Sequence, residues 1–346
     1  MSFVLCWYDS YRMLVNICLK YTNQDMVTWR RKKITCFLIL ISIFNIFRPD
    51  FKRMKHTGSY NFRLIAMGIL FALLWASASA ATKIGLQSAQ PFVIAVTRFF
   101  IAGIIMVFWA HAVLKVRLPQ QQEWKQLAIY GLLNISIYLG LYVIAMQYVS
   151  AGLGSLSVGT GPVLISIIAA FWLRQPIKRV TIFSLMLCTG GVIIAAYPLL
   201  KNSYATPAGL LILFMGILSY SAAAVYFSKN KWGDLHMLTI NGWQTLIGGF
   251  FLVPFLFIFY DGSKNAFDIK SIGSILWLAL PVSIGAVQLW LYLLKDNPVK
   301  AAFWLFLCPV FGFTIAAIML NEPINLYTFA GVGLVVAGLY IVQRKK

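Results

Sequence analysis

An arginine, Arg98, lies well inside a long apolar segment of the sequence, residues 92–114. It is about six residues from the nearer end of that segment, which in a helix corresponds to a depth of about 9 Å. A guanidinium at this depth can face a polar interior and bind a carboxylate or phosphate through two hydrogen bonds. It can also extend outward until its charge reaches the polar boundary. Arg98 is therefore a candidate anion-binding residue, with the outward orientation as the open alternative.

Two prolines, Pro162 and Pro309, lie near the centres of two further apolar segments. Proline lacks an N–H and frees a carbonyl one turn earlier, so it interrupts a helix. Paired interruptions at matching places in two halves of a membrane protein point to a binding site at mid-membrane, and a simple packing kink is the alternative. Thr160 lies between two glycines just before Pro162, and small residues allow a backbone or a ligand to come close.

Polar and aromatic side chains recur near the middle of several apolar segments. Asn134 and Tyr138 are four residues apart, and Asn241 and Gln244 are three apart, so each pair shares a helix face. Such side chains either hydrogen-bond between helices or line a cavity that orients a zwitterion or an aromatic ring. We expect several of them to line a cavity. The candidate substrate-binding residues are Trp75, Arg98, Asn134, Tyr138, Thr160, Pro162, Tyr220, Gln244, Gln288, Trp304 and Pro309.

Other chemistry has little support in the sequence. It contains no nucleotide-binding P-loop, zinc-protease or serine-hydrolase motif, and its five cysteines and three histidines form no disulfide or zinc pattern. The carboxylates after residue 53 lie in gaps or at helix ends, which disfavours proton coupling by a buried acid. These carboxylates are Glu123, Asp234, Asp261, Asp268, Asp296 and Glu322. We therefore expect no enzyme, no metal and no cofactor.

The composition is that of a protein embedded in lipid. The chain of 346 residues is 60% hydrophobic and 11% charged, whereas soluble domains carry about a quarter charged residues. Ten apolar segments have roughly the 20 residues that a helical span requires. They are residues 64–82, 92–114, 127–148, 151–173, 180–200, 207–227, 236–260, 272–294, 299–320 and 324–342. We predict an all-α polytopic membrane protein with ten transmembrane helices.

Basic residues between the segments indicate the orientation. The net charge is +20, and the even-numbered gaps hold ten Lys and Arg residues against four in the odd-numbered gaps. Because cytoplasmic loops of membrane proteins are enriched in Lys and Arg, we expect both termini on the cytoplasmic side of the cell (inner or plasma) membrane. Cations spread over short gaps are topology signals, so we expect no nucleic-acid partner.

Residues 1–53 differ from the rest of the chain. Their one apolar run, residues 34–47, has 14 residues and basic neighbours on both sides, which is short for a span. It is either an interfacial anchor or part of a stretch that is not natural coding sequence, with translation beginning at Met54. We favour the second interpretation.

The chain contains an internal repeat. A shift of 147 residues aligns Pro162 with Pro309 and Gly191 with Gly338, among eleven identities over residues 162–191. The repeated unit has five helices, and because five is odd, the second copy enters the membrane upside down. Such inverted repeats occur in many secondary transporters. We expect the two halves to be residues 54–203 and 204–346.

These features resemble the EamA-type branch of the drug/metabolite transporter superfamily over roughly residues 60–343. The resemblance rests on residues 74–83, Thr97-Arg98-Phe99, residues 145–162, the turn 319–323 with Glu322, and the glycine-rich segment 331–338. The first half has Gln175 where this family usually has a glutamate, which puts any role of that carboxylate in doubt.

The resemblance implies a secondary transporter that exports a small metabolite by alternating access. An anionic or zwitterionic solute such as an amino acid, or a drug, is the expected substrate, with the lipid bilayer as the other partner. A lipid flippase or scramblase and a non-transporting scaffold subunit are the alternatives. A coupling ion and the choice between monomer and homodimer stay open.

Overall fold

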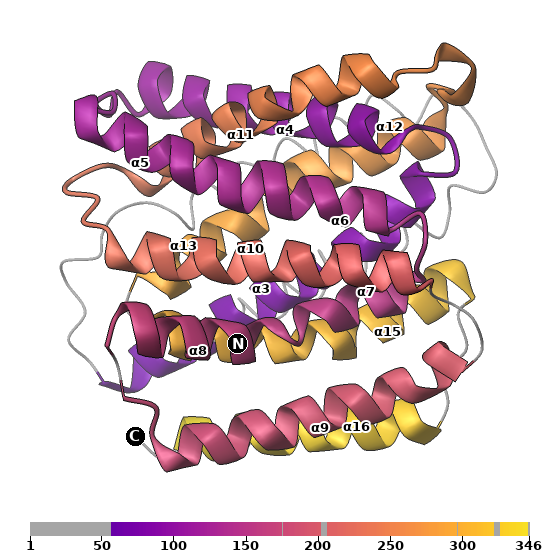
Figure 1. Ribbon diagram of the computed structural model, residues 1–346. Helices are drawn as coiled ribbons and strands as arrows, with labels where there is room; N and C mark the ends of the chain where they lie inside the picture. Colours follow the sequence, from indigo (N-terminus) through magenta and orange to yellow (C-terminus); the bar gives the residue numbers. More distant parts are fainter. Residues whose placement is uncertain (1–56, 175, 202–205, 296, 322–325, 345–346) are drawn as a thin grey trace, which may run out of the picture. The chain divides into compact units, whose positions relative to one another are not determined.

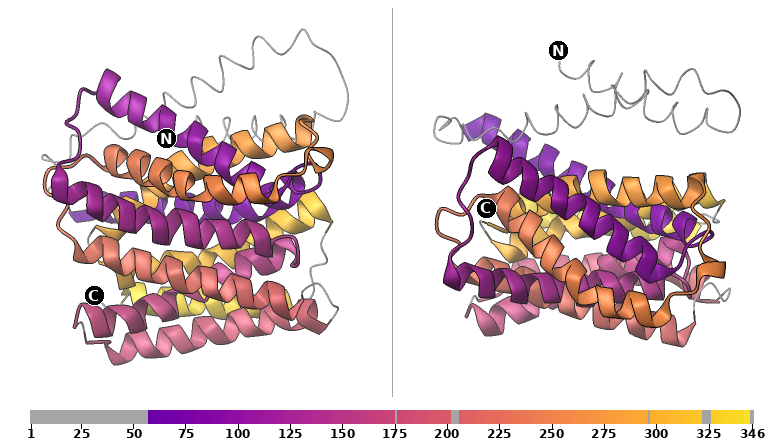
Figure 2. Two further views of the ribbon diagram at one scale, coloured as in Figure 1. Left: turned by 45° about the horizontal axis from the view of Figure 1, so that its top comes forward. Right: turned by 90° about the horizontal axis from the view of Figure 1, so that it is seen from above.

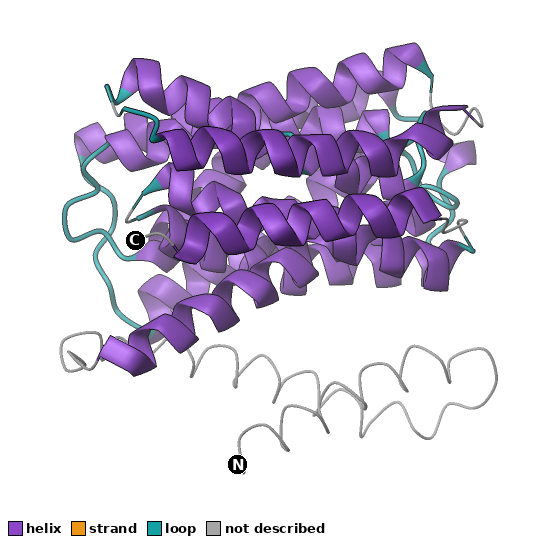
Figure 3. Ribbon diagram, turned by 90° about the horizontal axis from the view of Figure 1, so that it is seen from below, coloured by secondary structure: helices purple, strands orange, loops and turns teal. Residues whose placement is uncertain are grey.

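The computed structural model describes residues 57–174, 176–201, 206–295, 297–321 and 326–344. These residues form helices and connecting loops, and no strand occurs among them (Figure 3). The helices run along a common direction and their loops gather at the two ends (Figure 1, Figure 2). The expectations for residues 1–53, Gln175 and Glu322 concern positions outside the described residues.

Ten spans follow one another along the described chain, as predicted. Eight are long and apolar enough to cross a bilayer, and the apolar stretches Arg179–Gly191 of α9 and Leu326–Gly338 of α16 take the fifth and tenth positions. In chain order the spans are α3 (Thr57–Gly85); α4 with η2 (Pro91–Phe108, Trp109–Val113); α5, η3 and α6 (Gln121–Gly131, Leu132–Leu139, Gly140–Ala145); α7 and α8 (Ala151–Val158, Gly161–Trp172); α9 (Arg179–Lys201); α10 (Pro207–Lys229); α11 (Met237–Phe259); α12, η5 and α13 (Ile269–Trp277, Leu278–Ala286, Val287–Leu294); α14, η6 and α15 (Pro298–Ala302, Phe303–Phe306, Leu307–Leu320); and α16 (Leu326–Arg344). A short η4 (Gly262–Lys264) lies in the loop before α12.

The helix packing repeats across the two halves. In the first half α3 packs on α15, and in the second half its counterpart α10 packs on α8. Likewise α3 packs on α12 and η5, whereas α10 packs on η3 and α6. The second span packs on the seventh, and the fifth on the tenth, as the α9–α16 pair shows (Figure 1). At the level of whole spans, the first packs on the eighth and ninth and the sixth on the third and fourth, as expected for two inverted five-helix repeats.

The two spans that contain the paired prolines, Pro162 and Pro309, are interrupted just before the proline. The fourth span breaks between α7 and α8, with Pro162 in the first turn of α8. The ninth span changes to a 3-10 helix, η6, before Pro309 in α15. The local chemistry of proline accounts for both breaks, since it lacks an N–H and its ring crowds the carbonyl of the preceding turn.

Two π-helical segments, η3 and η5, occupy matching places in the third and eighth spans. The sequence analysis expected continuous helices here. In η5, Pro281 accounts for the wider turn, whereas η3 contains no proline and its widening has no signal in the composition. Because π turns hold more residues than α turns, Asn134 and Tyr138 in η3 reach different neighbours, and π segments are frequent at functional sites.

Candidate functional site

Five rings from four spans form an aromatic cluster, which we define as Phe71, Trp75, Tyr138, Tyr220 and Trp290. The ring centroids of Tyr138 and Tyr220 are 4.7 Å apart, and those of Tyr220 and Trp290 are 5.5 Å apart. Trp75 lies 6.0 Å from Tyr220, and Phe71 lies 5.0 Å from Trp290. All five side chains are buried in the protein. Three predicted residues, Trp75, Tyr138 and Tyr220, therefore come together.

Both helix interruptions border this cluster. A Cβ atom added to Gly161 would lie 4.0 Å from the Tyr220 ring and 3.4 Å from Leu305 of η6, so the break of the fourth span faces Tyr220 and the break of the ninth. Cys308, next to Pro309, lies within electrostatic range of Tyr138 and Tyr220. Pro162 and Pro309 thus adjoin the cluster.

Thr160, which was predicted beside the first proline, has a local partner. Its hydroxyl donates to the Ser157 carbonyl over 2.7 Å, which satisfies one carbonyl at the broken end of α7. The side chain is half-buried. The contact supports a role in shaping the break.

Arg98 is buried, with 1% of its side chain exposed, so it does not extend outward to the polar boundary. Its Cζ atom lies 4.5 Å from the centroid of the Phe99 ring, and Tyr138 and Tyr142 lie in its neighbourhood. Its Nε has no hydrogen-bond partner among the described residues, and none of the described ion pairs involves it. Because a buried charge without a counter-charge is costly, this guanidinium is suited to bind an anion.

Four amide side chains form an amide network, defined as Asn134, Asn241, Gln244 and Gln288. Asn134 Nδ2 donates to Gln244 Oε1 over 3.2 Å, and Gln244 Nε2 donates to Asn241 Oδ1 over 3.2 Å. Asn241 Nδ2 donates to Gln288 Oε1 over 3.4 Å and to the Ser283 carbonyl over 3.1 Å. The structure therefore gives these residues interhelical partners, which tie η3, α11 and α13 together.

Trp304, a predicted substrate-binding residue, packs beside Gly68 of α3. A Cβ atom on Gly68 would lie 2.1 Å from the Trp304 ring, so the indole occupies the space beside this glycine of α3. This contact holds η6 against α3 near the start of the first span.

Sequence reasoning did not select Phe71, Trp290 or Ser155. Phe71 precedes Trp75 by one helical turn, which was the available signal. Trp290 lies near the end of its span, where tryptophan is commonly interfacial. Ser155 completes a chain in which Ser79 Oγ hydrogen-bonds both the Tyr142 hydroxyl and Ser155 Oγ, each over 2.7 Å.

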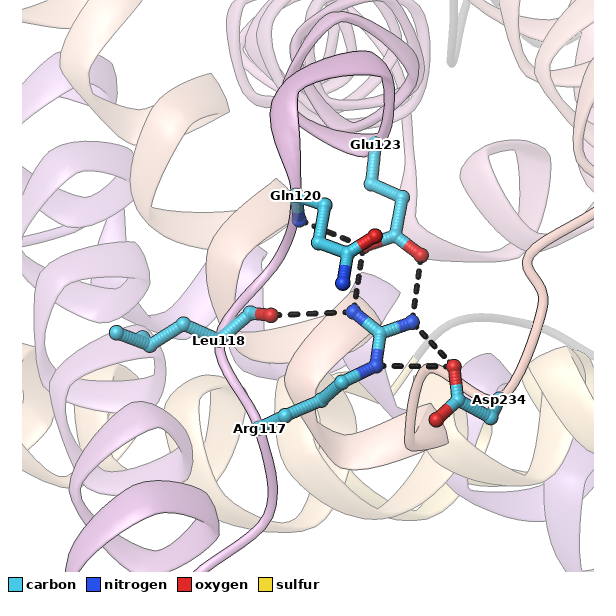
Figure 4. Close-up of polar contacts among 5 residues, drawn as sticks. All are labelled: Arg117, Leu118, Gln120, Glu123 and Asp234. Carbon is cyan, nitrogen blue, oxygen red and sulfur yellow. Dashed lines mark hydrogen bonds and ion pairs between the residues drawn. The ribbon is translucent and has the colours of Figure 1, made fainter.

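An ion-pair cluster ties the two halves together at one end of the helices (Figure 4). Arg117 donates to both oxygens of Glu123, over 2.8 and 2.7 Å, and its Nε donates to Asp234 of the other half over 2.9 Å. These hydrogen bonds lower the pKa of the Asp234 carboxyl. The pair with Asp234 is therefore present above the ordinary aspartate pKa and is lost as the pH falls through the lowered value.

The loops at the other end are also joined. The backbone N–H of Gln90 donates to Asn265 Oδ1 over 2.8 Å, and the Gln90 side-chain oxygen accepts from the Asp261 N–H over 2.8 Å. Lys83 Nζ donates to the carbonyls of Met146 and Val149, over 2.8 Å each. Hydrogen bonds thus join loops of the two halves at this end as well.

Comparisons with known proteins agree with this architecture. A family model described as "EamA-like transporter family" matches residues 62–197 and 207–344. An "Uncharacterized transporter" of Archaeoglobus fulgidus is 29% identical over 290 residues, covering 82% of this chain and 98% of that protein. "Protein PecM" of Dickeya dadantii is 25% identical, with 78% and 89% coverage. A solved structure titled "Crystal structure of protein" aligns with a TM-score of 0.67 at 15% identity, covering 81% of this chain and 98% of that one, which establishes the likeness of fold.

Proposed function

This chain belongs to the EamA-like transporter family, and we propose that it is a secondary exporter of a small anionic or zwitterionic metabolite or drug. The observation that carries the proposal is Arg98, a buried cation next to an aromatic cluster where the interrupted spans of both halves meet. Relatives named as transporters support the general function. The substrate and the direction are our proposal.

We propose two levels of involvement for the candidate residues. Arg98, Trp75, Tyr138 and Tyr220 contact the solute, and the breaks at Thr160, Pro162 and Pro309 give it backbone groups. Asn134, Gln244, Gln288 and Trp304 position the helices around it through the contacts described above. No group in this set is assigned a catalytic role.

Alternating access follows from the proposed inverted halves, residues 54–203 and 204–346. If the halves rock, the Arg117–Asp234 pair and the Gln90–Asn265 contacts must separate in turn, because each joins loops of different halves. Each tie is therefore proposed to open on its own side of the membrane.

We predict the orientation of both ends. With both termini in the cytoplasm, a cysteine at Gln122 should react with an impermeant label only from the cytoplasmic side, and one at Lys264 only from outside. The parent protein for this measurement lacks the native cysteines, and both residues are exposed. Labelling of Gln122 and Lys264 from the same side would contradict the inverted repeat.

Transport itself is predicted to appear as counterflow of a water-soluble solute. Purified protein in proteoliposomes preloaded with unlabelled amino acids or organic anions should accumulate the matching radiolabelled solute transiently. Translocation of fluorescent lipid without solute flux would instead indicate a flippase or scramblase. Absence of both activities from well-folded protein would indicate a scaffold subunit and would end the proposal.

A further inference from the structure

We infer that Tyr220 and Trp290 recognise an acceptor oxygen on a flat aromatic acid whose carboxylate binds Arg98. The inference rests on the proposed transport function and names the substrate class of the same site. Tyr220 and Trp290 are called the donor pair below. Tyr220 lies in α10 and Trp290 lies in α13, and both helices belong to the second half of the chain.

The indole and phenol groups of the aromatic cluster are hydrogen-bonded differently in the two halves. Each half contributes one indole and one phenol to the aromatic cluster. In the first half the Trp75 side chain hydrogen-bonds the Tyr138 hydroxyl. In the second half the Tyr220 hydroxyl and the Trp290 indole nitrogen are buried and have no hydrogen-bond partner among the described residues. The first pair is satisfied internally, and the donor pair is left for a ligand.

The donor pair specifies the chemistry of its partner. The exposed fractions of Tyr220 and Trp290 are 0% and 1%, so bulk water does not satisfy them. An indole N–H can only donate, and a phenol can donate equally well. A buried donor without a partner is destabilising, because its hydrogen bond to water has been lost and not replaced. A carbonyl, ether or carboxylate oxygen can accept a hydrogen bond from either donor, whereas an ammonium group has no lone pair and can accept from neither.

The aromatic cluster and Arg98 around the donor pair indicate the shape and charge of the rest of the ligand. The five rings of the cluster pack on one another with centroid distances of 4.7 to 6.0 Å, and aromatic surroundings of this kind favour a planar ring as the ligand. Arg98 lies in the neighbourhood of Tyr138, whose ring adjoins Tyr220, so the cation and the donor pair are both close to this ring. A sugar phosphate would bring many hydroxyls to faces that offer few partners. An aromatic acid with a second acceptor oxygen matches both ends.

Two benzoates of similar shape test the inference. 4-Acetylbenzoate carries a second acceptor oxygen, and 4-isopropylbenzoate does not. We expect the purified protein to bind 4-acetylbenzoate about tenfold more tightly, since one buried hydrogen bond contributes roughly 1.4 kcal/mol. Tyr220→Phe and Trp290→Phe should each lose most of this preference while binding 4-isopropylbenzoate as before, because both keep a ring in the stack. Dissociation constants follow from titration of tryptophan fluorescence, checked by calorimetry.

Tyr130→Phe is the matched control. Tyr130 is also buried with a hydroxyl that lacks a partner among the described residues, but it packs on Phe227 and Trp232 outside the cluster. This variant should keep the preference for 4-acetylbenzoate. Melting temperatures of the three variants within a few degrees of the parent protein establish that they are folded.

The outcomes separate this inference from the proposed function. Equal affinities for the two benzoates in the parent protein, or a preference that survives both substitutions, would overturn the inference. Counterflow of glucose 6-phosphate with no binding of either benzoate would also overturn it while supporting transport. A preference that depends on the donor pair, without counterflow of 4-acetylbenzoate, would support the inference and contradict the transport proposal.

Discussion

Replacing Arg98 by glutamine will lower the uptake of an anionic solute in counterflow by roughly a hundredfold. A charge-assisted, two-point hydrogen bond in a buried site contributes about 3 kcal/mol, which corresponds to this factor. Glutamine keeps much of the side-chain length and one donor group, so the change removes the charge with little loss of volume. The measurement is initial counterflow with 4-acetylbenzoate, or with whichever anion is exchanged most rapidly.

For the same variant we predict that stability does not fall, although transport does. Arg98 is buried and lies outside the described ion pairs, so its removal relieves a desolvation cost. We expect the melting temperature of Arg98→Gln to be equal to or above that of the parent protein. A purely structural arginine would lower it.

Lys178→Gln is the control for charge, because it removes one cation from an exposed position. It should leave counterflow within twofold of the parent protein. Unchanged anion uptake in Arg98→Gln would remove this residue from the site, whatever the melting temperature.

Replacing Gly191 by alanine will destabilise the packing of α9 on α16, whereas the same change at the adjacent Gly190 will not. A Cβ atom on Gly191 would lie 2.5 Å from the Gly331 carbonyl oxygen, and a Cβ atom on Gly190 would meet nothing within 4 Å. Overpacking against backbone costs about 1–3 kcal/mol. In a chain of this size the melting temperature should fall by about 1–4 °C.

Gly190→Ala is the internal comparison for that substitution, and alanine's better helix propensity should keep its melting temperature unchanged or slightly raised. The inverted repeat adds a further expectation. Gly338, the counterpart of Gly191, approaches Cys188 so closely that a Cβ atom would lie 2.3 Å from its sulfur, so Gly338→Ala should behave like Gly191→Ala. Equal melting temperatures for the Gly190 and Gly191 variants would show that this contact is not tight.

The sequence was sufficient for the number and order of the spans and for the duplicated architecture. A span is recognised by about 20 apolar residues in succession, and a repeat by identities in register, both of which are local or linear properties. The breaks at Pro162 and Pro309 were also predictable, because they follow from the missing N–H of proline itself.

The tertiary structure alone decided which polar groups meet. Asn134, Gln244 and Tyr220 were all predicted as substrate-binding residues because they are polar side chains near the middle of apolar segments. In the structure Asn134 and Gln244 hydrogen-bond each other, whereas the Tyr220 hydroxyl has no partner among the described residues. Arg98 could have pointed outward, and only packing against Phe99 and the neighbouring tyrosines determined that it is buried. The physical reason is that a buried polar atom is satisfied or not by helices far away in the chain, and helix periodicity describes a single helix without its neighbours.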